Sequence, residues 1–104
     1  MSAAATARAT TRVLIPSQLW SYTGGVKHVD VDRAAIASGS NCQLADVIAE
    51  IERRHPGFRF RIIDEQGRIR PHIKIFVGVE LAPDLRAALP EAKDVMIVGA
   101  LSGG

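Results

Sequence analysis

The sequence predicts an α+β domain in which one main helix packs on one face of a mixed sheet of four to five strands. The chain has 104 residues, of which 47% are apolar and 23% charged, as expected for one small domain with a single core. It contains one strongly amphipathic helical segment and several short strand-like runs. Because an amphipathic helix has to bury its apolar stripe, we expect that stripe to cover the sheet.

The helix is predicted over about 42–55. Four apolar residues recur at the i, i+3, i+4 and i+7 spacing that places them on one helical face: Leu44, Val47, Ile48 and Ile51. Ser40 or Asn41 can serve as the N-cap, and Pro56-Gly57 stops the helix. Arg53 and Arg54 suit the negative end of its dipole.

Two strands are expected before the helix. The run at 13–20 is rich in β-branched and large apolar residues, and Tyr22-Thr23-Gly24-Gly25 supplies the turn of a hairpin. A short second strand follows at 26–31. These features predict that the chain enters the sheet as a hairpin.

The second half of the chain predicts two more strands. The segment 73–77 alternates, with Ile73, Ile75 and Val77 facing inward, and 95–98 forms the closing strand. We expect a loop or short edge strand within 58–70, and a loop with a helical turn over 80–93, where Pro90 is a breaker. The pattern therefore places the main helix between the first and second pairs of strands.

Several apolar residues fall at outward positions of these strands, namely Leu14, Phe76, Met96 and Val98. Together they can form a patch on the sheet face opposite the helix, and such patches mark interfaces. Scattered apolar surface residues, or residues under a loop, are the alternative interpretation.

The two ends of the sequence differ in composition from the 13–100 domain. Residues 1–12 are rich in Ala, Thr and Arg and are predicted to be a disordered extension. The last four residues, 101–104, are Leu101, Ser102, Gly103 and Gly104. Since glycine has no Cβ, this tail is predicted to be thin and flexible, and four extended residues reach about 13 Å. A Gly-rich end without a role is the alternative.

The remaining reactive side chains give little support for catalysis or metal binding. Cys42 is the only cysteine, which excludes an internal disulfide, and we interpret it as a small residue at the start of the helix, with a redox role as the minor alternative. The three histidines lack metal spacing, so no metal site is predicted. With no nucleophile arrangement beside its carboxylates, the chain is not expected to be a freestanding enzyme.

Charge and hydropathy indicate the cell compartment and the class of partner. No apolar run is long enough for a membrane span, and no secretory signal is evident, so we expect a cytoplasmic protein.

Seven of the 13 Lys and Arg residues lie between Arg53 and Lys74. We favour a solvated rim there over an electrostatic surface for an acidic enzyme or nucleic acid. An aromatic content of only 5% argues against a dedicated nucleic-acid binder.

The order of elements and four local stretches resemble the β-grasp, ubiquitin-like sulfur carriers. These stretches are VLIP followed by TGG at 23–25, LADVIAEIE at 44–52, IKIFVG at 73–78 and VMIVGALSGG at 95–104. The family includes the molybdopterin synthase small subunit and the carriers of the thiamine and cysteine pathways. The stretches at 77–80 and 91–94 depart from the family's pattern, so the resemblance leaves the subfamily open, with a slight preference for the cysteine-pathway carriers.

The resemblance implies a carrier chemistry at the C-terminus. A ubiquitin-activating-type adenylating enzyme would use ATP and Mg²⁺ to adenylate the Gly104 carboxylate, and sulfur would then displace AMP to leave a thiocarboxylate. Gly103 would fit the enzyme's channel, and Ser102 and Leu101 would contact it. The chain would bind no cofactor, supply no catalytic group, and pass its sulfur to a biosynthetic enzyme.

Two other functions share these features. A ubiquitin-like modifier would conjugate the same Gly-Gly end to lysines, and the sequence does not separate it from a carrier. A noncovalent β-grasp interaction module would have an inert tail. The pathway that receives the sulfur also stays open at this stage.

Overall fold

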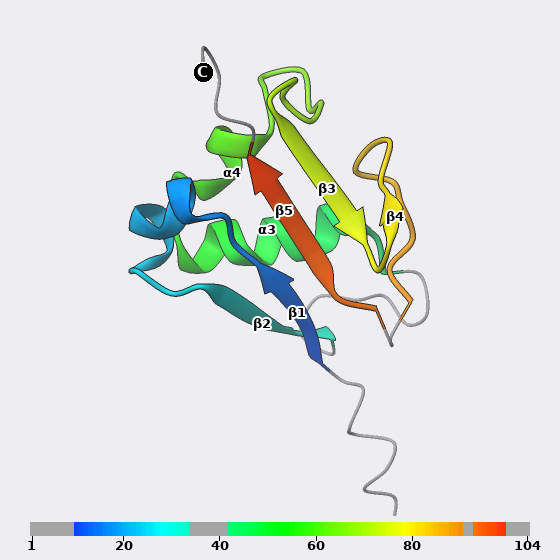
Figure 1. The fold of residues 1–104 in the computed structure, drawn as a ribbon, viewed down its shortest axis with the longest axis horizontal. Helices are drawn as coiled ribbons and strands as arrows, with labels where there is room; N and C mark the ends of the chain where they lie inside the picture. Colours follow the sequence, from blue (N-terminus) through cyan, green and yellow to red (C-terminus); the bar gives the residue numbers. More distant parts are fainter. Residues whose placement is uncertain (1–9, 34–41, 91–92, 100–104) are drawn as a thin grey trace, which may run out of the picture.

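A computed structural model describes residues 10–33, 42–90 and 93–99. Its strands form one five-stranded sheet in the order β2-β1-β5-β3-β4, as Figure 1 shows. The elements in chain order are β1 (Thr10–Leu14), η1 (Ser17–Thr23), β2 (His28–Asp32), α3 (Leu44–Arg54), α4 (Phe58–Ile62), β3 (Ile73–Val77), β4 (Glu80–Leu81) and β5 (Val95–Gly99). The predicted α+β class with a mixed sheet and one main helix is confirmed.

Strand β5 lies at the centre of the sheet. It pairs in parallel with β1, where Leu14 lies opposite Met96, and antiparallel with β3, where Phe76 lies opposite the same Met96. The outer strands β2 and β4 pair antiparallel with β1 and β3. One parallel contact among antiparallel ones makes the sheet mixed, and it brings the first and last described strands side by side.

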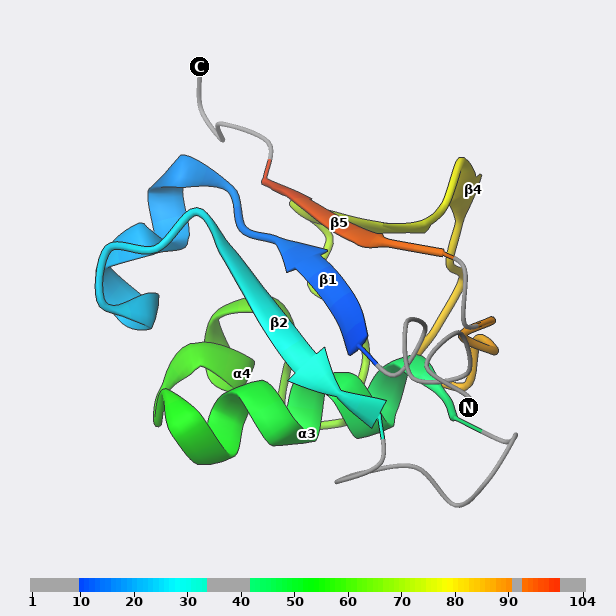
Figure 2. The ribbon, with the colours of Figure 1, turned by 90° about the horizontal axis from the view of Figure 1, so that it is seen from below.

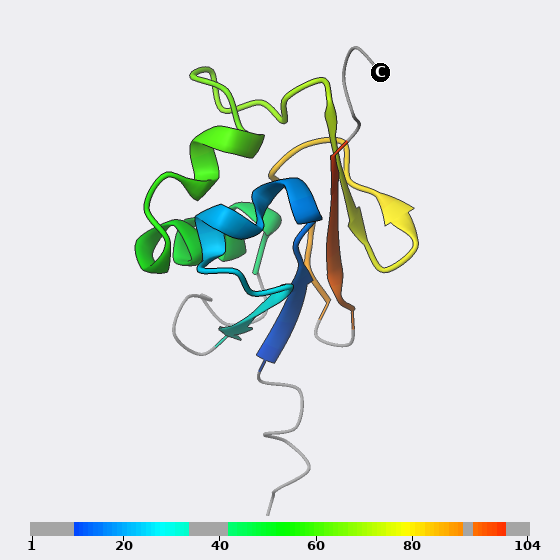
Figure 3. The ribbon, with the colours of Figure 1, turned by 60° about the vertical axis from the view of Figure 1, so that its left-hand side comes forward.

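The helices lie on one side of the sheet, as Figures 2 and 3 show from two directions. The predicted stripe of α3 is buried against inward residues of the strands, including Val13, Ile75 and Ile97. Each buried side chain of this kind contributes about 1.5–3 kcal/mol relative to exposure. The core therefore sits between α3 and the sheet, as the helical period predicts.

The start of α3 is fixed by polar contacts from two directions. The Gln43 N–H donates to Asp46 Oδ2 at 2.8 Å, while the N–H groups of Leu44 and Ala45 donate to the carbonyls of Ala87 and Leu85, both at 2.9 Å. These bonds satisfy N–H groups that a helix start leaves without partners. Gln43 is the N-cap. The predicted N-cap, Ser40 or Asn41, is therefore wrong, because the helix begins at Leu44; both residues lie outside the described part of the chain.

The first predicted strand has the wrong bounds. It begins at Thr10, so Thr10 to Arg12 belong to the sheet and not to the predicted 1–12 extension. It ends at Leu14, and Ser17–Thr23 form the 3-10 helix η1 instead of continuing the strand. Trp20 Nε1 donates to the Ile15 carbonyl at 2.8 Å, which folds this segment back on itself, and Gly24 ends it at φ 68°.

The predicted loop or edge strand within 58–70 is also corrected, because Phe58–Ile62 form the short helix α4. Phe58 and Ile62 are both fully buried, which is the i, i+4 spacing of a helix, whereas Phe60 is exposed. The Glu52 carboxylate of α3 accepts the N–H groups of Gly57 at 3.0 Å and Arg59 at 2.8 Å. This carboxylate joins the two helices.

The buried guanidinium of Arg33, the residue after β2, connects β1 to the loop before β5. Arg33 is only 7% exposed, and it donates to Thr11 Oγ1 at 2.9 Å and to the Leu89 carbonyl at 2.6 Å. Buried charges need such partners, because desolvation of an unpaired charge is costly. The contact links β1, the residue after β2 and the 82–90 segment.

Candidate functional site

The root of the predicted tail is held by the domain. Strand β5 ends at Gly99, and Gln18 Nε2 on η1 donates a hydrogen bond of 2.8 Å to the Gly99 carbonyl. A Cβ on Gly99 would lie 3.4 Å from that same Nε2, which is ordinary van der Waals contact. The predicted tail residues 101–104, including Gly103 and Gly104, lie outside the described residues. What the structure fixes is where the chain leaves the sheet.

The sheet face opposite the helices is open in the described part of the chain, where no helix covers it (Figures 2 and 3). Leu14 and Val98 on this face are each 38% exposed and Met96 is 40% exposed, while Phe76 is half-buried. Paired residues of neighbouring strands project on the same side of a sheet. Leu14, Met96 and Phe76 therefore form one row across β1, β5 and β3. The structure brings the four predicted patch residues onto one face.

The row continues onto a residue that the sequence interpretation missed. Leu81 on β4 is the register partner of Phe76 and is 53% exposed. It lies in a segment predicted to be a loop, and a two-residue strand is too short to give a periodic signal. We call Leu14, Met96, Phe76, Leu81 and Val98 the apolar row.

Polar residues border the apolar row. Lys74 lies opposite Val98, and His28 on β2 lies opposite Leu14. Both are exposed. An apolar patch with a polar rim is the usual composition of a protein–protein interface.

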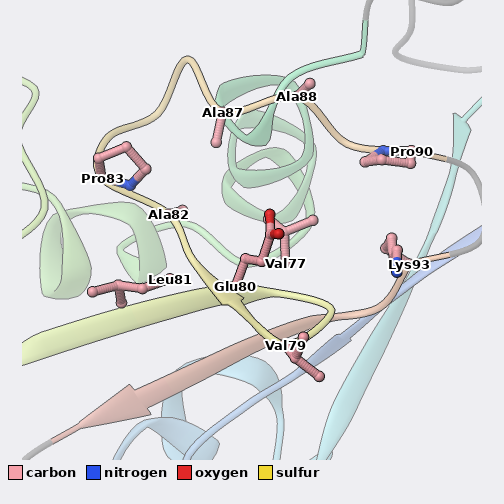
Figure 4. A pocket seen from close by; sticks show the side chains of 10 residues that line it. All are labelled: Val77, Val79, Glu80, Leu81, Ala82, Pro83, Ala87, Ala88, Pro90 and Lys93. Carbon is pink, nitrogen blue, oxygen red and sulfur yellow. The ribbon is translucent and has the colours of Figure 1, made fainter.

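A hollow of about 340 Å³ lies beside the β3–β4 hairpin, and Figure 4 shows the side chains around it. Its lining is mostly apolar, with Glu80 and Lys93 as the charged members. The Lys93 side chain lies against Gly78, where a Cβ would come within 2.9 Å of Lys93 Cδ. Gly78 also has φ 63°, so the tight hairpin depends on glycine here. The hollow adjoins the apolar row at Leu81.

The other candidate groups give no sign of a reactive centre. Cys42 lies just before α3 and is 2% exposed, and burial raises the pKa of its thiol, which opposes reactivity. Among the described residues, no group of three His, Cys, Asp or Glu side chains is placed to hold a metal ion. None of the described helices is long and apolar enough to cross a membrane.

The topology and the open face define the class of protein. A mixed sheet whose central strand is its last, with one main helix across one face, is the ubiquitin-like β-grasp fold. In this arrangement the described chain leaves the sheet from the end of the central strand, beside η1.

Comparison with solved structures supports this class. The chain is 28% identical to a protein in the Amycolatopsis orientalis BexX/CysO complex, with a TM-score of 0.72 over 90% of this chain and 99% of that one. It is 29% identical to Mycobacterium tuberculosis CysO, with a TM-score of 0.70 over 88% and 99%. SAMP1 from Haloferax volcanii shares the fold at 20% identity, with a TM-score of 0.73 over 91% and 99%.

Neither protein-family models nor curated protein sequences give a match to this sequence. The structural neighbours nevertheless support the β-grasp sulfur carrier family that the sequence resembles, and with it a ubiquitin-like carrier or modifier.

Proposed function

We propose that this protein is a sulfur carrier whose Gly104 carboxylate is converted to a thiocarboxylate. The observation that carries the proposal is the position of the Gly-Gly end, which follows Gly99 by a few residues in the sequence of a β-grasp domain. Similarity to Mycobacterium tuberculosis CysO, at 29% identity, and to a protein of the Amycolatopsis orientalis BexX/CysO complex, at 28%, supports it, because both identities lie above the range in which only the fold is shared.

The chemistry proceeds in two steps on an activating partner. A Gly104 carboxylate oxygen attacks the α-phosphorus of ATP, and pyrophosphate leaves, giving an acyl-adenylate. Sulfide then attacks the carbonyl carbon, and AMP leaves with the bonding electrons, so a thiocarboxylate remains. If the donor is a persulfide, a thiol must afterwards cleave the sulfur–sulfur bond. Mg²⁺ belongs to the partner's ATP, and activation is needed because a free carboxylate is a poor electrophile.

The chain's own contribution is to present and position the tail. Gln18 holds the carbonyl at the root of the tail, and the glycines that follow carry no side chains that would obstruct a narrow channel. The apolar row offers the docking face for an adenylating enzyme and, in turn, for the enzyme that accepts the sulfur. No acid, base or metal of this chain takes part.

For the acceptor pathway we propose the cysteine type, which the sequence resemblance slightly prefers over the molybdopterin and thiamine types. We propose a cytoplasmic location, because the two reactions need ATP and reduced sulfur, which are present there. The A. orientalis relative is found in a complex, in keeping with a protein that works through partners.

The test is intact-mass spectrometry of the untagged protein, incubated with ATP, sulfide and an extract of its own cells. The expected result is a mass gain equal to one oxygen exchanged for sulfur, located in the C-terminal peptide. A chain lacking Gly103-Gly104 is the control and should show no gain.

Two other outcomes would point elsewhere. Lysine-linked adducts of the chain without a thiocarboxylate would favour the modifier, which also uses the Gly-Gly end. Normal function of the truncated chain in cells would favour a noncovalent interaction module and contradict the carrier.

A further inference from the structure

A second hollow lies at the end of the molecule where β5 stops, and we call it the tail-exit pocket. Its volume is about 430 Å³, and its lining comes from η1, from α4 and from the segments on either side of residue 67: Gln18, Leu19, Tyr22, Phe60, Arg61, Glu65, Arg70 and His72. Gln18 also holds the Gly99 carbonyl. The pocket therefore adjoins the root of the tail, at the end of the sheet that Figure 1 shows beside α4.

Two arginines of this pocket are fixed on aromatic rings. The Arg61 guanidinium lies 4.6 Å from the centre of the Tyr22 ring, and that of Arg70 lies 4.5 Å from the centre of the Phe60 ring. Arg70 Nε also donates to the Phe60 carbonyl at 2.8 Å. Stacking of this kind restricts the long arginine side chain in advance, so less conformational entropy is lost when a ligand binds.

Neither arginine lies within ion-pair distance of a carboxylate among the described residues. The ion pairs found there involve Arg12, His28, Arg53, Arg54, Arg68 and Arg86, but neither Arg61 nor Arg70. At longer range Arg70 interacts with Asp64, whose carboxyl pKa is lowered by the Arg68 N–H and also by the charges of Arg68 and Arg70. Glu65 is the only acid in the lining, so the pocket keeps a net positive charge. A planar guanidinium with free N–H groups matches the two oxygens of a carboxylate.

We propose that the tail-exit pocket binds a carboxylate-bearing segment of the protein that processes the Gly-Gly end. An acidic protein segment fits better than nucleic acid, because the faces of Tyr22 and Phe60 that would stack on bases are covered by the arginines. The identity of that partner rests on the proposed function. The pocket is a second contact, separate from the apolar row, and it fixes the partner beside the tail.

The first experiment uses the full chain alone, with a short polyglutamate peptide as the probe and polyglutamine of equal length as its control. NMR should show saturable shifts of the Arg61 and Arg70 Nε–H signals with polyglutamate only. Arg61→Gln should weaken binding about tenfold, the scale expected for a lost charge-assisted contact. Arg61→Lys should restore part of it, and Arg86→Gln, at an exposed arginine outside the pocket, should leave it unchanged.

Several results would overturn the proposal: no saturable shift, equal shifts with polyglutamine, equal binding by Arg61→Gln, or tighter binding of a single-stranded RNA. If the Arg61 and Arg70 signals instead shift more on removal of residues 101–104 than on addition of polyglutamate, the occupant of the pocket is the chain's own tail. In that case the partner proposal is wrong.

The second experiment separates this proposal from the carrier function. With the adenylating enzyme of the same cells, Arg61→Gln should raise the KM for the carrier about tenfold and leave kcat nearly unchanged, since docking and not chemistry is affected. An unchanged KM with normal thiocarboxylate formation would reject the pocket's role and leave the carrier function standing. If the chain binds polyglutamate but forms no thiocarboxylate, the carrier function is rejected and the pocket's affinity for carboxylates stands.

Discussion

The two faces of the sheet have opposite environments although the same strands supply both. On β5, Ile97 is 2% exposed and its neighbour Met96 is 40% exposed. On β3, Ile75 is fully buried and Phe76 is half-buried. Apolar residues on the helix side hold the fold together, whereas those on the open side are available for contact. Hydrophobicity alone therefore does not separate stabilising residues from docking residues here, but side-chain direction does.

The largest expected effect tests the helix layer on the covered side. Phe58→Ala should lower the free energy of unfolding by about 3–5 kcal/mol, because it empties a fully buried site between α4 and the core. Phe60→Ala, on the same helix but exposed, should cost about 1 kcal/mol or less. Denaturant unfolding measures both. Equal costs would contradict the assignment of α4 in place of a strand.

The next effect compares the two faces within one strand. Ile97→Ala should lower the free energy of unfolding by about 2–5 kcal/mol, and Met96→Ala by about 1 kcal/mol or less. The measurement is again chemical denaturation, with the slope of the transition checked for both variants. A cost for Met96→Ala as large as that for Ile97→Ala would mean that the open face is covered in the free protein.

The third prediction concerns the apolar row itself. Phe76→Asp should weaken binding of the adenylating enzyme at least about tenfold while the domain stays folded, because it places a charge in the middle of the row. Val26→Asp, at an exposed apolar residue before β2, is the matched control and should bind normally. Isothermal calorimetry and circular dichroism check affinity and fold. Unchanged affinity in Phe76→Asp would remove the row from the docking surface.

The smallest effect is a pH dependence that arises between the two helices. Backbone N–H groups of Gly57 and Arg59 hold the pKa of the Glu52 carboxyl below its usual value. The stability this provides is present above the unfolded-state pKa of about 4.3 and is lost as the pH falls through the lower folded-state pKa. In Glu52→Gln this part of the acid-induced loss should vanish. Glu80→Gln, on exposed β4, is the control. If the free energy of unfolding falls with pH identically in Glu52→Gln and the wild type, the contact of the Glu52 carboxylate with α4 does not contribute to the pH dependence.

Most of the fold was predictable, because apolar residues recur with a clear helical spacing along α3 and with a clear alternation along β3 and β5. The segment FRFRI at 58–62 was not predictable, since apolar and basic residues alternate there with the period of a strand. Burial of Phe58 and Ile62 but not Phe60 shows that tertiary packing on α3 decides in favour of a helix. Similarly, η1 depends on the contact of Trp20 with the Ile15 carbonyl, which no local pattern indicates.

The candidate site was predictable in part. Alternation was enough to place Leu14, Phe76, Met96 and Val98 on one face, because the side-chain period of a strand is two. Leu81 was missed because its strand has only two residues. The tail-exit pocket was missed because its lining joins η1 and α4, the two helices absent from the prediction. The roles of Leu101, Ser102, Gly103 and Gly104 stay predictions.

The central place of β5 also orders events during synthesis. Strands β1 and β3 each pair with β5, which leaves the ribosome after both of them. Until Val95 to Gly99 emerge, the edges of β1 and β3 that pair with β5 stay unpaired, so the sheet cannot close without them. A truncated translation product would therefore expose these edges to proteases. The part of the apolar row that crosses β1, β5 and β3 therefore forms only once β5 has been made.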